Sequence, residues 1–149
     1  MLVYRVCNKD EVEYILNNQN FLFVGGLFFA GTTHHYEKDY LYMHFFLNKR
    51  DILYMSASKD RCICTYDIPK AILDKTVGLG TYLDYINFHH QEQVLEFAIK
   101  SEFMKIEYLK QVDLLLDSLD YEDFFTEELD ASKYKTIYGE KLIRVRKRK

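Results

Sequence analysis

The chain has 149 residues, of which 48% are hydrophobic and 29% charged, and its net charge is -3 at pH 7. This length suits one hydrophobic core, and the composition excludes a disordered chain, so we expect a single domain over residues 1–149. No apolar stretch approaches the roughly 20 residues that cross a bilayer, and the first residues lack a secretion signal. The sequence therefore predicts a cytoplasmic protein with no membrane partner.

The first third of the chain predicts a strand followed by a helix. Residues 2–6 are rich in β-formers, and residues 9–18 form an amphipathic helix that Asn8 can cap. Its apolar residues fall on one face: Val12, Ile15 and Leu16. Residues 21–31 then indicate a hairpin or a bent strand, and residues 32–40 a polar loop. Residues 41–47 fit either a buried strand or the first turn of a helix.

The clearest strand is RCICTYDI, residues 61–68, which alternates Cys62, Cys64 and Tyr66 on one face with Ile63, Thr65 and Asp67 on the other. Pro69 ends it and suits the first position of a helix over residues 69–75. Before and after this strand we expect a helix over 48–58, a loop over 78–93, a strand over 94–100 and a single turn capped by Ser101. The segment over 106–116 is extended or helical, with a strand preferred at its start. An acidic helix over 120–129, a final strand over 141–146 and a basic tail over 146–149 that frays complete the chain. The predicted fold is α+β, a mixed and mostly antiparallel sheet with several short helices.

Metal and phosphate motifs are weak. Adjacent histidines on an extended chain point to opposite sides, so the doublets 34–35 and 89–90 each offer one ligand at most. Cys62 and Cys64 lack the spacing of zinc knuckles and are better explained as buried strand residues. The sequence GLG at 78–80 lacks the glycine pattern that surrounds a nucleotide phosphate. We therefore expect no metal site.

Three separated pieces resemble the ADP-ribosyltransferase superfamily. They are Arg5 in the first strand, the aromatic and His-bearing segment KDYLYMHFF at 38–46, and Glu96 in a late strand that is followed by IEYL at 106–109. The last piece is similar to the poly-ADP-ribose polymerase branch, which has a catalytic Glu and, about ten residues on, Ile or Val before Tyr-Leu. Where relatives carry Ser-Thr-Ser, this chain offers only Thr32 and Thr33.

The resemblance implies an NAD-dependent transferase, such as a bacterial or phage toxin or modifier, with a protein or nucleic acid as acceptor. Glu96 would be the catalytic carboxylate that stabilises an oxocarbenium-like ribose. Arg5 would hold a phosphate or ribose of NAD, and Tyr40 or Tyr42, with His44, would contact the cofactor. Otherwise, Glu96 is a solvent-facing strand residue and Arg5 pairs with an acidic neighbour. The enzymatic hypothesis requires the side chains of Arg5 and Glu96 to face a common cleft.

Charge is distributed unevenly near the C-terminus. Residues 113–130 contain eight acidic and no basic residues, whereas residues 133–149 contain eight basic residues against Glu140 alone. The acidic run could imitate the phosphates of a nucleic acid and occupy a basic groove. The alternative hypothesis is therefore a non-catalytic phage or prophage interaction module that inhibits a host protein through an acidic surface.

Overall fold

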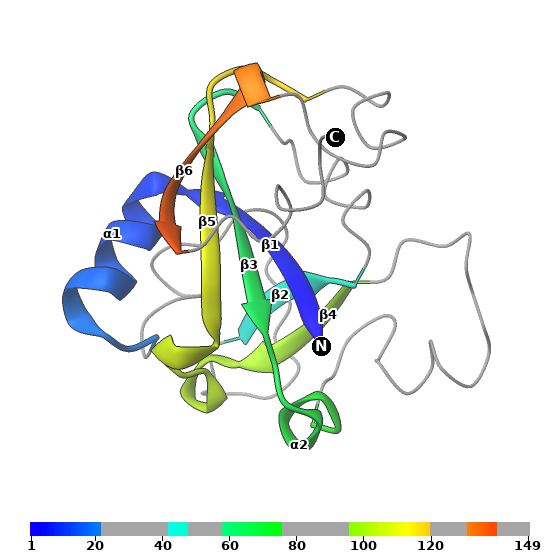
Figure 1. Ribbon diagram of the computed structural model, residues 1–149. Coiled ribbons are helices and arrows are strands. Elements are labelled where there is room, and N and C mark those ends of the chain that lie inside the picture. The colour runs from blue at the N-terminus through cyan, green and yellow to red at the C-terminus, as the bar shows by residue number, and fades with distance from the viewer. Residues whose placement is uncertain (22–41, 48–57, 76–95, 120–130, 140–149) are drawn as a thin grey trace.

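The computed structural model describes residues 1–21, 42–47, 58–75, 96–119 and 131–139 (Figure 1). Six strands form one sheet in the order β4-β2-β1-β3-β5-β6, and every neighbouring pair is antiparallel. The strands are β1 (Leu2–Asn8), β2 (Tyr42–Phe46), β3 (Arg61–Asp67), β4 (Glu96–Lys100), β5 (Leu109–Leu115) and β6 (Tyr134–Gly139). The predicted α+β class is confirmed in its coarse form, but strands dominate, and the described strands contain no parallel pair.

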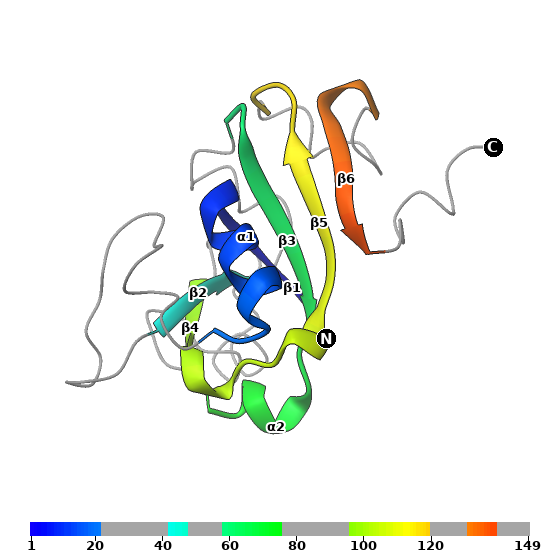
Figure 2. The ribbon, with the colours of Figure 1, turned by 90° about the vertical axis from the view of Figure 1, so that its left-hand side faces the viewer.

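Helices are few in the described part of the chain. They are α1 (Lys9–Asn18), α2 (Lys70–Leu73) and three 3-10 turns at Ser101–Phe103, Ile106–Tyr108 and Ala131–Lys133. Helix α1 lies across one face of the sheet, in front of β1 and β3 in Figure 2, while α2 lies beyond the end of β3. No helix among the described residues is long and apolar enough to cross a membrane.

Both faces of the sheet bury apolar side chains. The face that carries α1, called here the α1 face, holds the larger cluster, which includes Val3, Cys7, Phe45, Cys64 and Phe97. The opposite face holds a smaller cluster of Val6, Phe46, Ile63, Leu115, Leu119 and Tyr134. Because side chains alternate along a strand, neighbouring positions of β1, β2 and β3 belong to different clusters. The α1 face takes the odd positions of β1 and β2 and the even positions of β3.

Several predicted elements are confirmed. Strand β1, helix α1 and strand β3 lie where the sequence places them, and Val12 and Ile15 are buried as expected. The open choice at residues 41–47 is decided for the strand β2. The predicted strand over 94–100 is described from Glu96 onward, as β4.

Other expectations are wrong in detail. Asn8 precedes α1, but its side chain makes no capping hydrogen bond. Pro69 is the residue before α2 and not its first residue, and Ser101 begins a 3-10 turn whose cap position is Lys100. The strand expected to start at Ile106 starts at Leu109 instead, after a 3-10 turn. Strand β6 was not predicted.

Some predicted elements lie outside the described residues. These are the segments 22–40 and 48–57, the loop over 78–93, the acidic helix over 120–129, the strand over 141–146 and the tail over 146–149.

Gly139 closes the β5–β6 pairing. Its φ of +83° lies in the left-handed region that favours glycine, and an added Cβ would meet the backbone oxygen of Lys110. The close approach of the two backbones at this point therefore requires a residue without a side chain.

Candidate functional site

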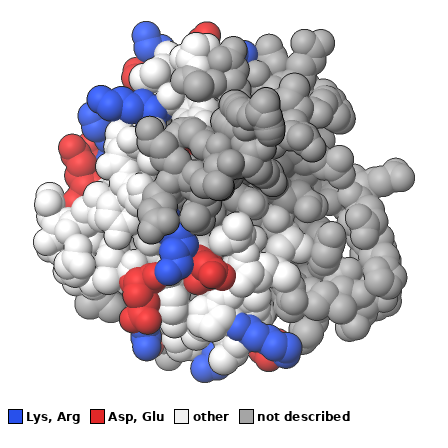
Figure 3. Space-filling model, in the orientation of Figure 1, with Lys and Arg blue, Asp and Glu red and all other residues white. Residues whose placement is uncertain are grey.

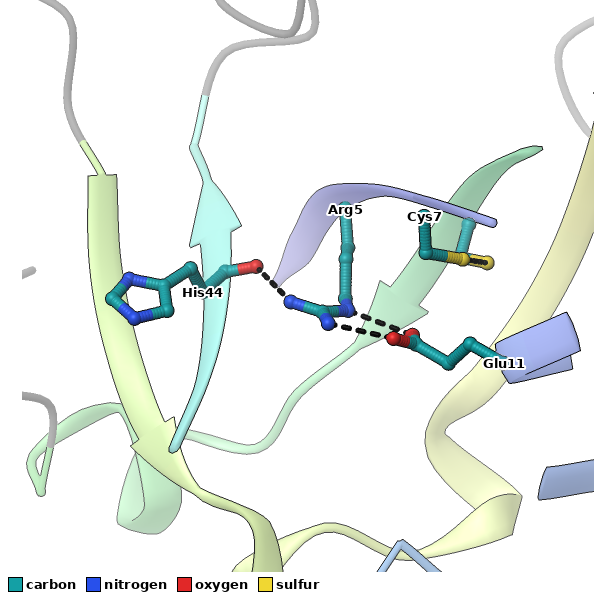
Figure 4. A network of polar contacts seen from close by, with 5 residues as sticks. Arg5, Cys7, Glu11 and His44 are labelled. Atoms are coloured by element: carbon teal, nitrogen blue, oxygen red, sulfur yellow. Dashed lines mark hydrogen bonds and ion pairs between the residues drawn. The ribbon is translucent and has the colours of Figure 1, made fainter. Parts of the chain in front are cut away.

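A buried ion pair joins β1 to α1 (Figure 4). The guanidinium of Arg5 donates from Nε to Glu11 Oε2 at 2.8 Å and from Nη2 to Glu11 Oε1 at 2.7 Å. Its third nitrogen, Nη1, donates to the backbone oxygen of His44 at 3.1 Å. Arg5 is 4% exposed and Glu11 is 0% exposed. All three guanidinium nitrogens of Arg5 therefore donate hydrogen bonds inside the protein.

The local sequence explains how this pair forms. Strand β1 ends at Asn8 and α1 begins at Lys9, so the helix folds back over the α1 face without a connecting loop. Glu11 lies in the first turn of α1, where the helix dipole favours a carboxylate. Burial alone would lower the pKa of Arg5, but the charge of Glu11 and its hydrogen bonds outweigh burial and raise that pKa. Arg5 is therefore charged in the folded protein.

Three free cysteines lie buried beside the ion pair. Cys7 and Cys64 have their sulfur atoms 3.6 Å apart. This contact, together with burial, raises the pKa of Cys7 well above its usual range. Burial also raises the pKa of Cys62, to about 12. Since the thiolate is the reactive form, these thiols are protected from chemistry while the protein is folded.

Tyr66 completes the buried group on the α1 face. It is fully buried, and its ring makes edge contacts with Phe21 and Phe45. Burial raises the pKa of its hydroxyl well above the ordinary value. That hydroxyl has no hydrogen-bond partner in the described part of the chain. Tyr66 therefore serves the core chiefly through its ring.

The predicted site residues divide between the two faces of the sheet. Tyr42 is buried and His44 half-buried on β2, and the imidazole of His44 points away from Arg5 in Figure 4. Glu96 is the first residue of β4, and its Cα is the register partner of Phe46. Alternation along β2 therefore assigns positions 42, 44 and 96 to one face. Tyr40 lies outside the described residues.

Positions 5 and 96 do not share a face. Phe46 is the register partner of both Glu96 and Tyr4, so these three positions belong to one cross-strand row. Arg5 follows Tyr4 and therefore lies on the other side of the sheet. The register therefore does not bring positions 5 and 96 to one face of the sheet, as the enzymatic hypothesis expects. Glu11 and the His44 carbonyl occupy donors of Arg5, so Arg5 has a structural role in the fold, and its expected role toward a cofactor stays a prediction.

A second polar cluster, missed by the sequence analysis, lies on the face opposite α1. Asp113 is 2% exposed and accepts hydrogen bonds from Gln111 Nε2, at 3.1 and 2.9 Å, and from Thr136 Oγ1 at 2.7 Å. The neutral donors Gln111 and Thr136 stabilise this carboxylate inside the sheet. Asp113 is therefore not part of an acidic surface, as its place in the run 113–130 had suggested.

Comparison of the chain with protein-family models, curated proteins and solved structures found no match. The resemblance to ADP-ribosyltransferases, NAD as cofactor and the role of Glu96 therefore stay predictions. Among the described residues, no group of three or more His, Cys, Asp or Glu could hold a metal ion.

The buried ion pair yields a prediction about stability. Glu11→Gln leaves the Arg5 charge buried without its counter-charge, so we expect the free energy of unfolding to fall by roughly 3–5 kcal/mol. The double variant Arg5→Met/Glu11→Leu removes both charges and should recover most of this loss. Urea unfolding followed by circular dichroism measures each variant.

The matched control for this test is the exposed pair of Lys70 and Asp74, whose nitrogen and oxygen are 3.2 Å apart. Asp74→Asn should change stability little, because solvent screens exposed pairs. A double variant at positions 5 and 11 that is as unstable as Glu11→Gln would show that the charge itself does not explain the loss.

The buried thiol of Cys62 predicts a pH dependence. Its pKa is about 12 in the folded protein, against 9.0 ordinarily, so the unfolded chain loses this proton first as pH rises. The free energy of unfolding should fall between about pH 9 and pH 12, by at most about 1.4 kcal/mol per pH unit. Urea unfolding at about pH 8 and pH 10 should show a smaller fall for Cys62→Ala than for the wild type. Equal falls would contradict the prediction.

Proposed function

We propose that this chain is a non-catalytic interaction module that binds a basic partner through residues 117–130, called here the acidic segment. The observation that carries the proposal is the position of Arg5 and Glu96 on opposite faces of the sheet. Arg5 is also held by Glu11 inside the α1 face, so the two donors that the enzymatic hypothesis assigns to the cofactor are occupied. This favours the alternative hypothesis, in which the chain acts by binding.

The sheet holds both ends of the acidic segment. It connects the neighbouring strands β5 and β6, whose residues Leu115 and Tyr134 are register partners. The next residue, Leu116, donates its backbone N–H to the oxygen of Lys133 at 2.8 Å. Ser118 accepts a hydrogen bond from the backbone N–H of Lys59 at 3.3 Å. The segment therefore leaves from, and returns to, one end of the sheet.

Seven carboxylates belong to this segment after Asp113 is assigned to the interior, and no basic residue lies among them. They are Asp117, Asp120, Glu122, Asp123, Glu127, Glu128 and Asp130. On the face that Figure 3 shows, the described part of the surface carries acidic and basic groups interspersed. A concentrated negative charge attracts a positively charged surface and speeds association with it. The partner class is a protein with a basic groove, such as one that holds nucleic-acid phosphates.

A labelled arginine-rich peptide is a direct probe of this surface. We expect binding, measured by fluorescence anisotropy, to weaken steeply as salt rises from low to physiological concentration, because exposed charges are screened. The triple variant Asp120→Asn/Glu122→Gln/Asp123→Asn should weaken binding roughly tenfold at low salt, if each charge contributes about 0.5 kcal/mol.

The matched control removes the same charge elsewhere, at the exposed residues Glu13, Glu102 and Glu107. The triple variant Glu13→Gln/Glu102→Gln/Glu107→Gln should bind nearly as the wild type does. Equal weakening in both triple variants, or an affinity that does not depend on salt, would refute the acidic segment as the binding surface.

A second candidate function is that of an NAD-binding, ADP-ribosyltransferase-like protein in which Glu96 is catalytic. It is favoured by the common face of positions 42, 44 and 96 on the neighbouring strands β2 and β4. In this candidate, Tyr42 and His44 contact the cofactor, and Arg5 takes no part.

NAD distinguishes the two candidates. A ligand that binds only the folded form at about one hundred times its dissociation constant stabilises it by about 2.7 kcal/mol. The second candidate therefore predicts a clear rise in Tm with NAD, and predicts that Glu96→Gln abolishes NAD turnover while Tm stays within a few degrees. An unchanged Tm with NAD would remove this candidate, and turnover lost together with the fold would count against Glu96.

A further inference from the structure

Arg61 is the first residue of β3, and backbone hydrogen bonds hold it and the residue before it. The preceding residue, Asp60, adopts a φ of 74° and donates its N–H to the oxygen of Leu115 at 2.9 Å. Arg61 donates its own N–H to the oxygen of Ser58 at 3.1 Å. These bonds fix the residue at the end of the sheet where β3 begins and β5 ends, the upper end in Figure 1.

The guanidinium of Arg61 is unusual for its unsatisfied donors. Its Nε and Nη2 atoms are buried, and within the described residues they find no hydrogen-bond partner. A guanidinium is always charged at physiological pH, and a buried donor that loses water without gaining a partner is costly. Such a group in a folded protein calls for a ligand that completes it.

Arg5 shows, in the same sheet, what these two atoms bind. Its Nε and Nη2 hold the two oxygens of Glu11 at 2.8 and 2.7 Å. This parallel pair of donors matches the spacing of two oxygens on one carboxylate or phosphate. Arg61 presents the same pair of donors, with no carboxylate bound to them among the described residues.

We propose that Arg61 forms an oxyanion-binding site, which takes the carboxylate or phosphate group of a small ligand between Nε and Nη2. The residue as a whole is half-buried, so part of its side chain already meets solvent, and the proposal requires the side chain to rotate so that Nε and Nη2 reach the ligand. Ile63 lies on the same face two residues along β3 and packs in the smaller apolar cluster. Arg61 lies on β3, at the end of the sheet from which the acidic segment leaves, and the proposed site uses none of positions 42, 44 and 96.

The test measures Tm of the full chain with inorganic phosphate and, separately, with citrate, each against chloride at equal ionic strength. At about ten times the dissociation constant, we expect a rise in Tm of about 4 °C. A rise with phosphate alone identifies a phosphate site, and a rise with citrate alone a carboxylate site. Arg61→Met should abolish the rise, and Arg61→Lys should reduce it, because an ammonium keeps the charge but loses the paired donors.

Lys110→Met is the matched control, since it removes an exposed cation at the start of β5 and should leave the rise unchanged. Without added anion, Arg61→Met should be as stable as the wild type or more stable, because it removes an unpaired buried charge. No rise with either anion, or an equal rise in Arg61→Met, would overturn the proposal. A large loss of stability in Arg61→Met without any anion effect would also overturn it, because Arg61 would then serve a partner within the chain.

Discussion

The buried pair of Arg5 and Glu11 is the constraint on which the arrangement of the described sheet depends. One guanidinium holds three elements together: it lies on β1, binds the carboxylate of α1 and reaches the backbone oxygen of His44 on β2. Two desolvated charges are costly, and their attraction repays that cost only when the geometry is good and the remaining donors are satisfied. Both conditions hold here, so α1 is confined to one orientation over the sheet. An apolar contact would tolerate sliding, whereas the paired hydrogen bonds do not.

Local patterns in the sequence were sufficient for α1, β1 and β3, because periodicity reports burial when one or both faces of an element pack against the core. They were insufficient for β6. Its partly exposed residues alternate weakly, and it lies at the edge of the described sheet, where one strand neighbour is enough. The turn at Ile106–Tyr108 was missed because its alternation resembles that of the strand that follows. Glu11 was overlooked although a signal existed: it lies four residues before Ile15, on the buried side of the helix.

The relation between Arg5 and Glu96 shows where prediction from one sequence ends. Alternation gives the two faces of each strand separately, but only the register between strands says which faces coincide. Strands β1 and β4 are not neighbours, so their relation passes through β2 and depends on two registers. A shift of one residue in either register would have placed positions 5 and 96 on the same face. The candidate residues could be identified from the sequence, but their juxtaposition could not.

The buried charged side chains on the two faces of the described sheet are satisfied in different ways, and the difference bears on where ligands bind. Arg5 is neutralised by Glu11 on the α1 face, and Asp113 is solvated by Gln111 and Thr136 on the opposite face. Neither group has capacity left for a ligand without breaking bonds that stabilise the fold. Arg61, at the end of the sheet, has two donors that find no partner among the described residues. Binding is therefore expected at the ends of the strands and in the segments that join them, where a charged group can meet a partner without disturbing the core.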